Sequence, residues 1–216
     1  MNNIFYKDIK LSIHPIFFIM PVLTGGLFLI PKWPYFIALM YFFWISMPNI
    51  FAIFNAQNDF GFSITMPVSK PYIVKGKFMS FLFLELLHLA TGTVFALIHR
   101  LLYGLDNFAL NPNMAFFGAA FIGFGLFNIL FFPNYFRTVY KYGVPLIIGI
   151  VVITLFFAGV EFSLLAGENI SRFMEGTASS MRLFQLSVLI FGMILFALLN
   201  LLAVRMSIKR FEKVDL

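Results

Sequence analysis

The chain has 216 residues, of which 61% are hydrophobic and 11% are charged, and its formal net charge is +6. Soluble domains hold about 45–50% apolar and about 25% charged residues, so this composition excludes an ordinary soluble domain and indicates an integral membrane protein. Cysteine is absent, which excludes disulfides, thiolate metal sites and cysteine nucleophiles. The length suits about six spanning helices in a single domain, residues 1–216.

The first residues predict an amphipathic helix that lies in the inner headgroup region of the membrane. Asn3, Lys7, Lys10 and His14 recur at helical spacing and form a polar stripe. Apolar residues line another face of the same helix, namely Phe5, Ile9, Ile13 and Phe17. The alternative is a polar stretch without a defined role ahead of the first span.

Six long apolar stretches predict an all-α protein with six transmembrane helices. They cover residues 15–30, 33–54, 76–103, 113–133, 144–165 and 183–204. The first stretch is short and contains two prolines and a glycine pair. We therefore expect this span to begin earlier or to be kinked.

The positions of the basic residues predict a plasma-membrane protein with both termini in the cytoplasm. Lysine and arginine favour the cytoplasmic side of short loops. An N-terminus inside the cell, followed by six spans, leaves only Lys32, Arg100, Arg172 and Arg182 outside. The cytoplasmic set is Lys7, Lys10, Lys70, Lys75, Lys77, Arg137, Lys141, Arg205, Lys209, Arg210 and Lys213. Because these charges are scattered over the span ends, they do not indicate nucleic-acid binding.

The loop between the second and third spans, residues 58–78, predicts an extended segment followed by a helix. Apolar residues alternate along its first half, at Phe60, Phe62, Ile64, Met66 and Val68. Ser69 is suited to an N-cap and Pro71 to the first turn of a helix that continues into the third span. Lys75 and Lys77 would then reach the headgroup level. These residues alone leave two alternatives, an ordinary interfacial loop or a docking site for a cytoplasmic partner.

The segment MPVSKPYIVKGKF within this loop resembles an element of bacterial ATP-binding-cassette (ABC) type-2 export permeases. The resemblance is to a six-span branch that includes exporters of phenol-soluble modulins, lantibiotics and drugs. It implies a short cytoplasmic coupling helix that docks on a separate ATPase, and an N-terminal elbow helix near that ATPase. The residues that match by position are Met66, Pro67, Val68, Ser69, Lys70, Tyr72, Ile73, Val74 and Lys77. Met66 replaces a more usual leucine and Pro71 replaces a helix former, so the start of the coupling helix stays open.

The resemblance also implies the partners and the cargo. Two ATPase subunits would carry ATP and magnesium, and the permease would form a homodimer or a heterodimer with a similar chain in the lipid membrane. The cargo would be a hydrophobic or amphipathic peptide, or a drug, moved out of the cell. The chain itself has no phosphate-loop or hydrolase motif, so we expect neither enzymatic activity nor a bound cofactor. An ATP-independent channel or secondary carrier is the alternative.

Two ionisable residues, Glu85 and His88, fall inside the third predicted span. Such residues are costly in a membrane and usually face a cavity or a partner, and this spacing places both on one helix face. They either pair with each other or are hydrated near the interface, or they line a polar pathway or a subunit seam. A single Glu-x-x-His does not make a di-iron site, so we expect no metal.

Three further patterns concern packing and the remaining loop. Residues 167–182 predict a short external helix between the fifth and sixth spans. Small residues on the fourth span, Gly118, Ala119, Gly123 and Gly125, predict close helix packing, either within one subunit or between two. The 32 phenylalanines fit a lipid-facing and a pathway-lining surface equally well, and a membrane-facing surface is the preferred explanation over an adaptation to a hydrophobic cargo.

Overall fold

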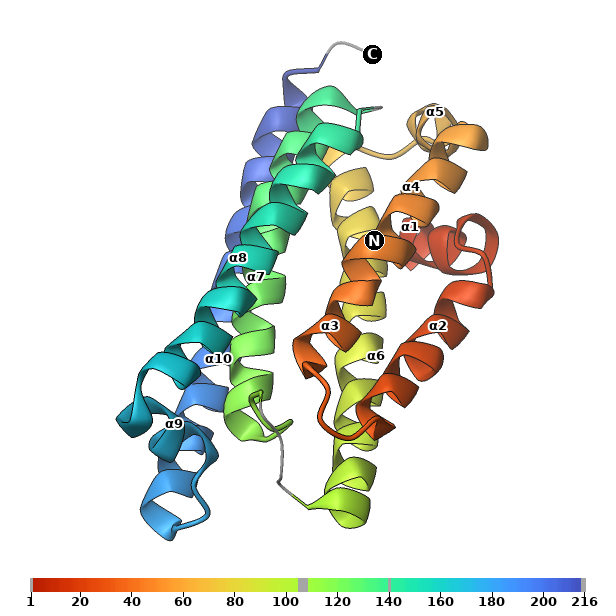
Figure 1. The fold of residues 1–216 in the computed structure, drawn as a ribbon. Helices are drawn as coiled ribbons and strands as arrows, with labels where there is room; N and C mark the ends of the chain where they lie inside the picture. Colours follow the sequence, from red (N-terminus) through yellow and green to blue (C-terminus); the bar gives the residue numbers. More distant parts are fainter. Residues whose placement is uncertain (1, 105–108, 140, 215–216) are drawn as a thin grey trace.

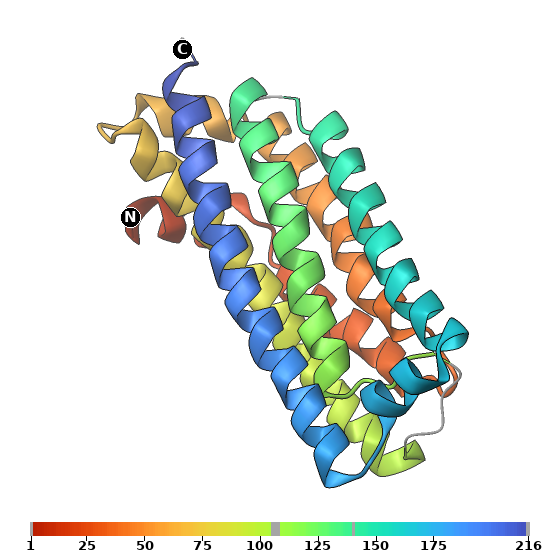
Figure 2. The same cartoon turned by 90° about the vertical axis from the view of Figure 1, so that its left-hand side faces the viewer.

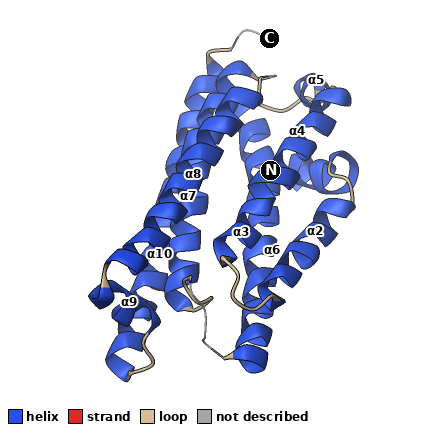
Figure 3. Ribbon diagram, viewed as in Figure 1, coloured by secondary structure: helices blue, strands red, loops and turns tan. Residues whose placement is uncertain are grey.

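The computed structural model describes residues 2–104, 109–139 and 141–214, and these ranges are helical and contain no strand (Figures 1 and 3). Five helical segments are long and apolar enough to cross a membrane. They are Tyr35–Ala56, α6 (Lys70–Tyr103), α7 (Met114–Thr138), α8 (Gly143–Ala166) and α10 (Ser179–Glu212). The predicted all-helical membrane fold is confirmed, with five spans, or six if one bent pair of helices counts as a span.

The bent pair lies at the N-terminus, where a kink was expected. α1 (Asn2–Lys7) continues into a π-helical turn, Asp8–Ser12, and α2 (Ile16–Gly25) continues into a 3₁₀ turn, Gly26–Leu29. The two parts meet at 77°. The ten residues of α2 and the four of the 3₁₀ turn rise roughly 23 Å, less than the ~30 Å of a bilayer core. The segment Ile16–Leu29 is therefore too short to cross the bilayer core without the residues of the first part.

The second span also changes its helical form. It begins as α3 (Tyr35–Tyr41), passes through a π-helical turn, Phe42–Ser46, and ends as α4 (Met47–Ala56). Pro48 is the second residue after the π turn and has no backbone N–H to donate to the preceding turn. The missing bond accounts for the altered helix at this position.

The loop after α4 forms a helix where an extended segment was expected. α5 covers Asp59–Thr65, and Asn58 before it has a left-handed backbone with φ +46°. Asp59, Phe60 and Ser63 are all buried, and this spacing lies on one face of a helix, whereas a strand would place Phe60 on the face opposite to the other two. The prediction was wrong because contacts with other helices select the helical period. α6 then begins at Lys70, with Ser69 at the N-cap position and Pro71 in the first turn, as expected.

α7, α8 and α10 pack as a group, and α9 (Glu168–Glu175) connects α8 with α10, which confirms the short helix expected there (Figure 2). The small residues of α7 serve this packing. A Cβ on Gly118 would lie 2.6 Å from the Val188 carbonyl oxygen on α10, and one on Gly123 would lie 2.6 Å from the Phe157 ring on α8. The small-residue surface is therefore used within this chain.

Phenylalanine fills the core more than it covers the surface. Twenty of the 32 phenylalanines are buried among the described residues, so the expectation of a mainly lipid-facing role was wrong. Phe51 stacks on Phe81 of α6 with ring centroids 4.8 Å apart and meets Tyr135 of α7 at 4.7 Å. Close aromatic pairs of this kind join α4, α6 and α7 into one core.

The two ends of the helical bundle differ. At one end, called the α5 end, lie α5, the beginnings of α6 and α8, and the final turns of α7 and α10 (Figures 1 and 2). α1 lies toward the same end (Figure 2). At the other end, called the α9 end, lie α9, the last turn of α6 and the first turn of α7 (Figure 1).

Candidate functional site

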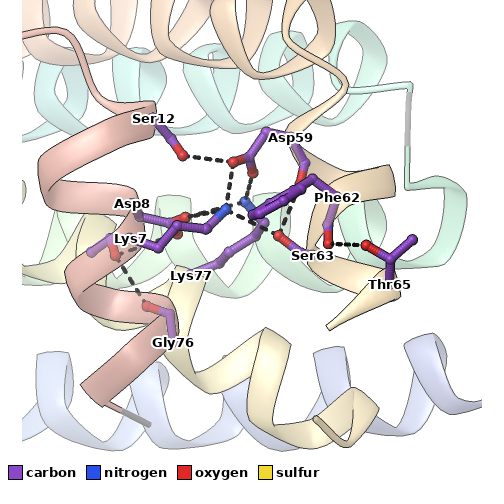
Figure 4. A network of polar contacts seen from close by, with 10 residues as sticks. Lys7, Asp8, Ser12, Asp59, Phe62, Ser63, Thr65, Gly76 and Lys77 are labelled. Atoms are coloured by element: carbon purple, nitrogen blue, oxygen red, sulfur yellow. Dashed lines mark hydrogen bonds and ion pairs between the residues drawn. The ribbon is translucent and has the colours of Figure 1, made fainter. Parts of the chain in front are cut away.

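Four charged residues form a buried cluster that joins α1, α5 and α6 at the α5 end (Figure 4). The charge cluster consists of Lys7, Asp8, Asp59 and Lys77, with side chains at most 6% exposed. Asp59 lies between the two lysines, because Lys7 Nζ pairs with its Oδ1 and Lys77 Nζ pairs with its Oδ2. Asp8 Oδ1 lies 2.9 Å from Lys7 Nζ and 3.6 Å from Lys77 Nζ. Two positive and two negative charges thus balance inside the protein.

Serine hydroxyls and an aromatic ring complete the surroundings of the cluster. Ser12 Oγ donates to Asp59 Oδ1 at 2.6 Å, and Lys7 Nζ donates to Ser63 Oγ at 3.0 Å. Lys77 Nζ also lies 4.4 Å from the centroid of the Phe54 ring, a cation–π contact. Each lysine is therefore held by neighbours from more than one helix.

The cluster holds Asp59 in its charged form. Burial raises the pKa of this carboxyl group, but the charge of Lys77 and the hydrogen bonds from Lys7, Lys77 and Ser12 lower it. The net effect is a pKa below the ordinary aspartate value. Removing one member of a buried ion pair costs about 3–5 kcal/mol, because the other charge stays buried without compensation. The cluster therefore strongly favours the docked arrangement of α1, α5 and α6.

A glycine allows α1 to approach α6 closely enough to reach the cluster. A Cβ on Gly76 would lie 2.6 Å from Ile4 Cβ on α1. Gly76 is buried and sits one residue before Lys77 (Figure 4). A larger side chain here would push α1 away from the lysine that binds Asp59.

The N-terminal helix differs from its prediction in the orientation of one charged side chain, that of Lys7. A polar stripe containing Lys7 was expected to face the headgroups, but Lys7 is 5% exposed and turns to Asp59. The side chain of Asn3, another member of that stripe, lies outside the described residues. Lys10 is exposed and its Nζ lies 4.7 Å from the Tyr6 ring, while Leu11 is 74% exposed. The face that is open to a membrane surface thus carries Tyr6, Lys10 and Leu11.

The residues that match the coupling element divide into an open and a buried group. Pro67 and Ser69 are exposed, and the half-buried members are Met66, Val68, Lys70 and Tyr72. Ile73, Val74 and Lys77 are at most 1% exposed and lie within the helix bundle. A direct contact of these three with a partner is incompatible with this arrangement. The expectation that Lys77 reaches the headgroups was also wrong, because two buried carboxylates bind its charge inside the chain.

The loop after α5 is connected to the C-terminal part of the chain. Lys70 Nζ donates to the Val214 carbonyl oxygen at 2.7 Å. The Phe60 ring on α5 lies 5.3 Å from the Phe211 ring on α10. Movement of α5 would therefore displace its contacts with both α6 and α10.

Glu85 and His88 lie inside the bundle and turn to different partners. Glu85 Oε2 accepts a hydrogen bond from Asn128 Nδ2 on α7 at 2.7 Å, and the same Nδ2 lies 2.8 Å from Asn200 Oδ1 on α10. His88 Nδ1 lies 3.4 Å from Thr24 Oγ1 on α2. The two residues do not pair with each other, and both are at most 3% exposed. Their role in a pathway or seam stays a prediction.

Two groups of residues escaped the sequence analysis. Asn128 and Asn200 are amides within apolar spans. Their position could have predicted the contact, because polar residues in a membrane need hydrogen-bond partners. Asp8 and Asp59 are isolated acids in segments that otherwise carry only basic residues. Their joint position with Lys7 and Lys77 depends on the bend between α1 and α2. Among the described residues, no group of three or more His, Asp or Glu side chains could hold a metal ion.

Comparison with known proteins identifies the family of the chain. Neither the curated proteins nor the solved structures gave a significant match. The family described as "ABC-2 family transporter protein" matches residues 3–212, nearly the whole length. This match agrees with the resemblance seen at the loop between the second and third spans, although it does not single out a branch. The chain therefore belongs to the ABC-2 transporter family, as a membrane permease component.

Proposed function

We propose that this permease binds an ABC ATPase through the docking segment, which consists of α5, residues 66–69 and the first turn of α6. The observation that carries the proposal is the charge cluster. It fixes a short, partly exposed helix against the long helix α6 and against the N-terminal helix. The outer side of the segment offers Phe62, which is 55% exposed, and the exposed Pro67 and Ser69. An apolar knob of this kind suits a groove on a partner protein.

The contacts of α5 would convert ATPase movement into movement of the spans. Asp59 binds Lys77 on α6 and Lys7 on the N-terminal helix, so a push on α5 acts on both. α6 is one continuous helix of 34 residues that reaches the α9 end. The Glu85–Asn128–Asn200 bonds link its middle to α7 and α10. The push would tilt α6 and the helices bound to it as rigid bodies. This tilting would open the membrane path alternately to the two sides.

The distribution of charge supports a cytoplasmic α5 end. The eleven basic residues assigned to the cytoplasm lie in α1, its π-helical extension, the beginning of α6, the end of α7, the connection to α8, and the last part of α10 with the residue that follows it. All of these are at or near the α5 end, and the remaining four basic residues lie toward the α9 end. Positive loops stay on the cytoplasmic side, so both termini would be cytoplasmic and the membrane would be the plasma membrane.

A complete transporter would contain two permeases and two ATPases, the latter holding ATP and magnesium. The second permease would be another copy or a similar chain. The proposed cargo is a hydrophobic or amphipathic peptide, or a drug, moved outward, as in the branch that the loop resembles. Family membership favours this ATP-driven mechanism over an ATP-independent channel or carrier.

Co-purification of the permease with a co-expressed ABC ATPase tests the proposal. The variant Phe62→Asp with Pro67→Asp should lose a stoichiometric ATPase complex that the wild type retains. Phe173→Asp is the matched control, because Phe173 is 48% exposed on α9 at the opposite end. All forms should elute as single species in size-exclusion chromatography. Retention of the ATPase by the double variant, or equal loss in the control, would show that docking does not use this segment.

Uptake by inside-out vesicles tests the cargo. With the ATPase present, ATP should drive a labelled amphipathic peptide into the vesicles. A complex that hydrolyses ATP but never accumulates peptide would argue against the cargo class while leaving the docking segment intact.

A further inference from the structure

Two adjoining cavities at the α9 end form one amphipathic groove between α6, α7 and α10. The first has a volume of about 300 Å³ and is lined mainly by apolar residues, including Leu97, Phe117, Phe121, Leu189 and Met193. The second has a volume of about 180 Å³ and is lined mainly by polar residues, including Arg100, Glu175, Arg182 and Gln185. Arg100, Asn113 and Met114 line both cavities. An apolar cavity thus adjoins a polar cavity that is lined by a pair of arginines.

The polar part of the groove has unused positive charge. The one carboxylate among its described lining residues, Glu175, accepts hydrogen bonds from the Asn111 backbone N–H at 3.1 Å and from Asn111 Nδ2 at 3.0 Å. The side chains of Arg100 and Arg182 are exposed, and neither forms an ion pair with a described residue. The described lining of the groove therefore carries two guanidinium groups against one carboxylate, which leaves a net positive charge.

The apolar part of the groove is open to the lipid phase. Leu97 on α6 is 59% exposed and Met193 on α10 is 42% exposed. Both helices are candidate membrane spans, so these side chains border the hydrocarbon region. An acyl chain can enter such a cavity from the membrane, whereas a fully soluble ligand would leave its apolar walls unfilled.

We propose that this groove binds one anionic phospholipid, with an acyl chain between α6 and α10 and the phosphate at Arg100 and Arg182. Guanidinium groups suit this role because they bind phosphate with two parallel hydrogen bonds and remain charged. The bound lipid would connect the last turn of α6 with the first turn of α10. This site is at the end opposite to the docking segment and does not depend on an ATPase.

Native mass spectrometry of the purified protein with equal amounts of phosphatidylglycerol and phosphatidylcholine tests the site. The wild type should retain one phosphatidylglycerol in preference to phosphatidylcholine. Arg100→Gln with Arg182→Gln should weaken phosphatidylglycerol binding ~30-fold, since each arginine contributes about fivefold. Arg172→Gln is the matched control, because Arg172 is exposed on α9 and lines neither cavity. Equal retention by the double variant, or equal loss in the control, would overturn the proposal.

Two further measurements separate the acyl chain from the headgroup. Leu97→Trp should narrow the apolar cavity and reduce lipid retention, while a phosphatidylglycerol analogue with a photoreactive acyl chain should label peptides from α6 or α10. Glycerol phosphate should not displace the lipid at the same concentration. Displacement by glycerol phosphate, or labelling only outside these helices, would show an anion site without an acyl site and would contradict the proposal.

Discussion

Lys77 on α6 and Asp59 on α5 form an ion pair that is at most 5% exposed, although Asp59 belongs to the connection between two spans and Lys77 lies near the start of the following span. Lys75, two residues earlier on the same helix, is exposed. The pair of lysines offers a direct comparison of a buried and an exposed charge.

Lys77→Met should destabilise the protein much more than Lys75→Met. The first change leaves Asp59 and Asp8 buried with one lysine in place of two, and we expect a loss of about 3 kcal/mol. The second removes an exposed charge and should change stability by less than about 0.5 kcal/mol. Thermal unfolding of the detergent-purified variants measures both. Similar unfolding temperatures for the two variants would mean that the cluster contributes little.

The stability that Asp59 provides should disappear only in acid. Because its pKa is lowered in the folded protein, its contribution is complete above the ordinary aspartate range near 3.9 and is lost as pH falls through the lower native value. The difference in unfolding temperature between wild type and Asp59→Asn should stay constant from neutral pH to about 4. It should shrink below that pH. Glu212→Gln, which changes an exposed carboxylate, serves as the control, and a difference that already shrinks near neutral pH would contradict the assignment.

Gly192→Ala should loosen the contact between α7 and α10. A Cβ on Gly192 would lie 2.8 Å from Gly118 Cα and closer still to the Gly118 carbonyl oxygen, so a methyl group forces the helices apart. We expect a cost of about 1–3 kcal/mol. Gly159→Ala is the control, because a Cβ there meets nothing within 4 Å. Unfolding temperatures of both variants test the contact, and equal values would place it outside the stabilising core.

Asn128→Leu should destabilise the protein more than Glu85→Gln. The leucine removes the amide that donates to Glu85 and leaves a buried polar group without its partner, at a cost of about 1–3 kcal/mol. Glutamine at position 85 keeps an oxygen that can accept the same bond. Thermal unfolding again provides the measurement. A larger loss for Glu85→Gln would show that the carboxylate charge itself matters to the fold.

A role of Glu85 and His88 in transport is tested separately from their role in packing. If they line a pathway or a subunit seam, Glu85→Gln and His88→Ala should reduce peptide transport and cargo-stimulated ATP hydrolysis in variants that remain folded. Unchanged values of both activities would remove the pathway hypothesis and leave a structural role.

Some features of the fold could be predicted from the sequence, because they depend on interactions between residues that are close together in the chain. Pro71 and Ser69 predicted the start of α6, since a proline tolerates the first turn and a helix needs a cap there. Pro15 lies within the 77° break before α2, and the proline-rich first span was expected to kink. The run of apolar residues in each long span predicted a membrane helix, because a bilayer selects length and hydropathy.

α5 illustrates why other features could not be predicted from the local sequence. Its apolar residues alternate like those of a strand, yet the segment is helical, because a helix buries Phe60 on the same side as Asp59 and Ser63, which both contact Lys7. Lys77 looked like an interfacial lysine, and only the arrival of Asp8 and Asp59 from two other segments explains its burial. The local sequence pattern indicates the environment that a residue favours. It does not indicate which charge from a distant part of the chain will neutralise that residue.

The sequence by itself determined the membrane class, the all-helical fold and the position of the loop that resembles an ABC-2 coupling element. These follow from composition, hydropathy and short motifs, which act over one or two helical turns. The tertiary structure alone decided which residues of that loop are open to a partner and which are held inside by the charge cluster. Ion pairing joins residues that are far apart in the chain, such as Asp8 and Lys77, and the sequence alone does not show which of these residues meet in space.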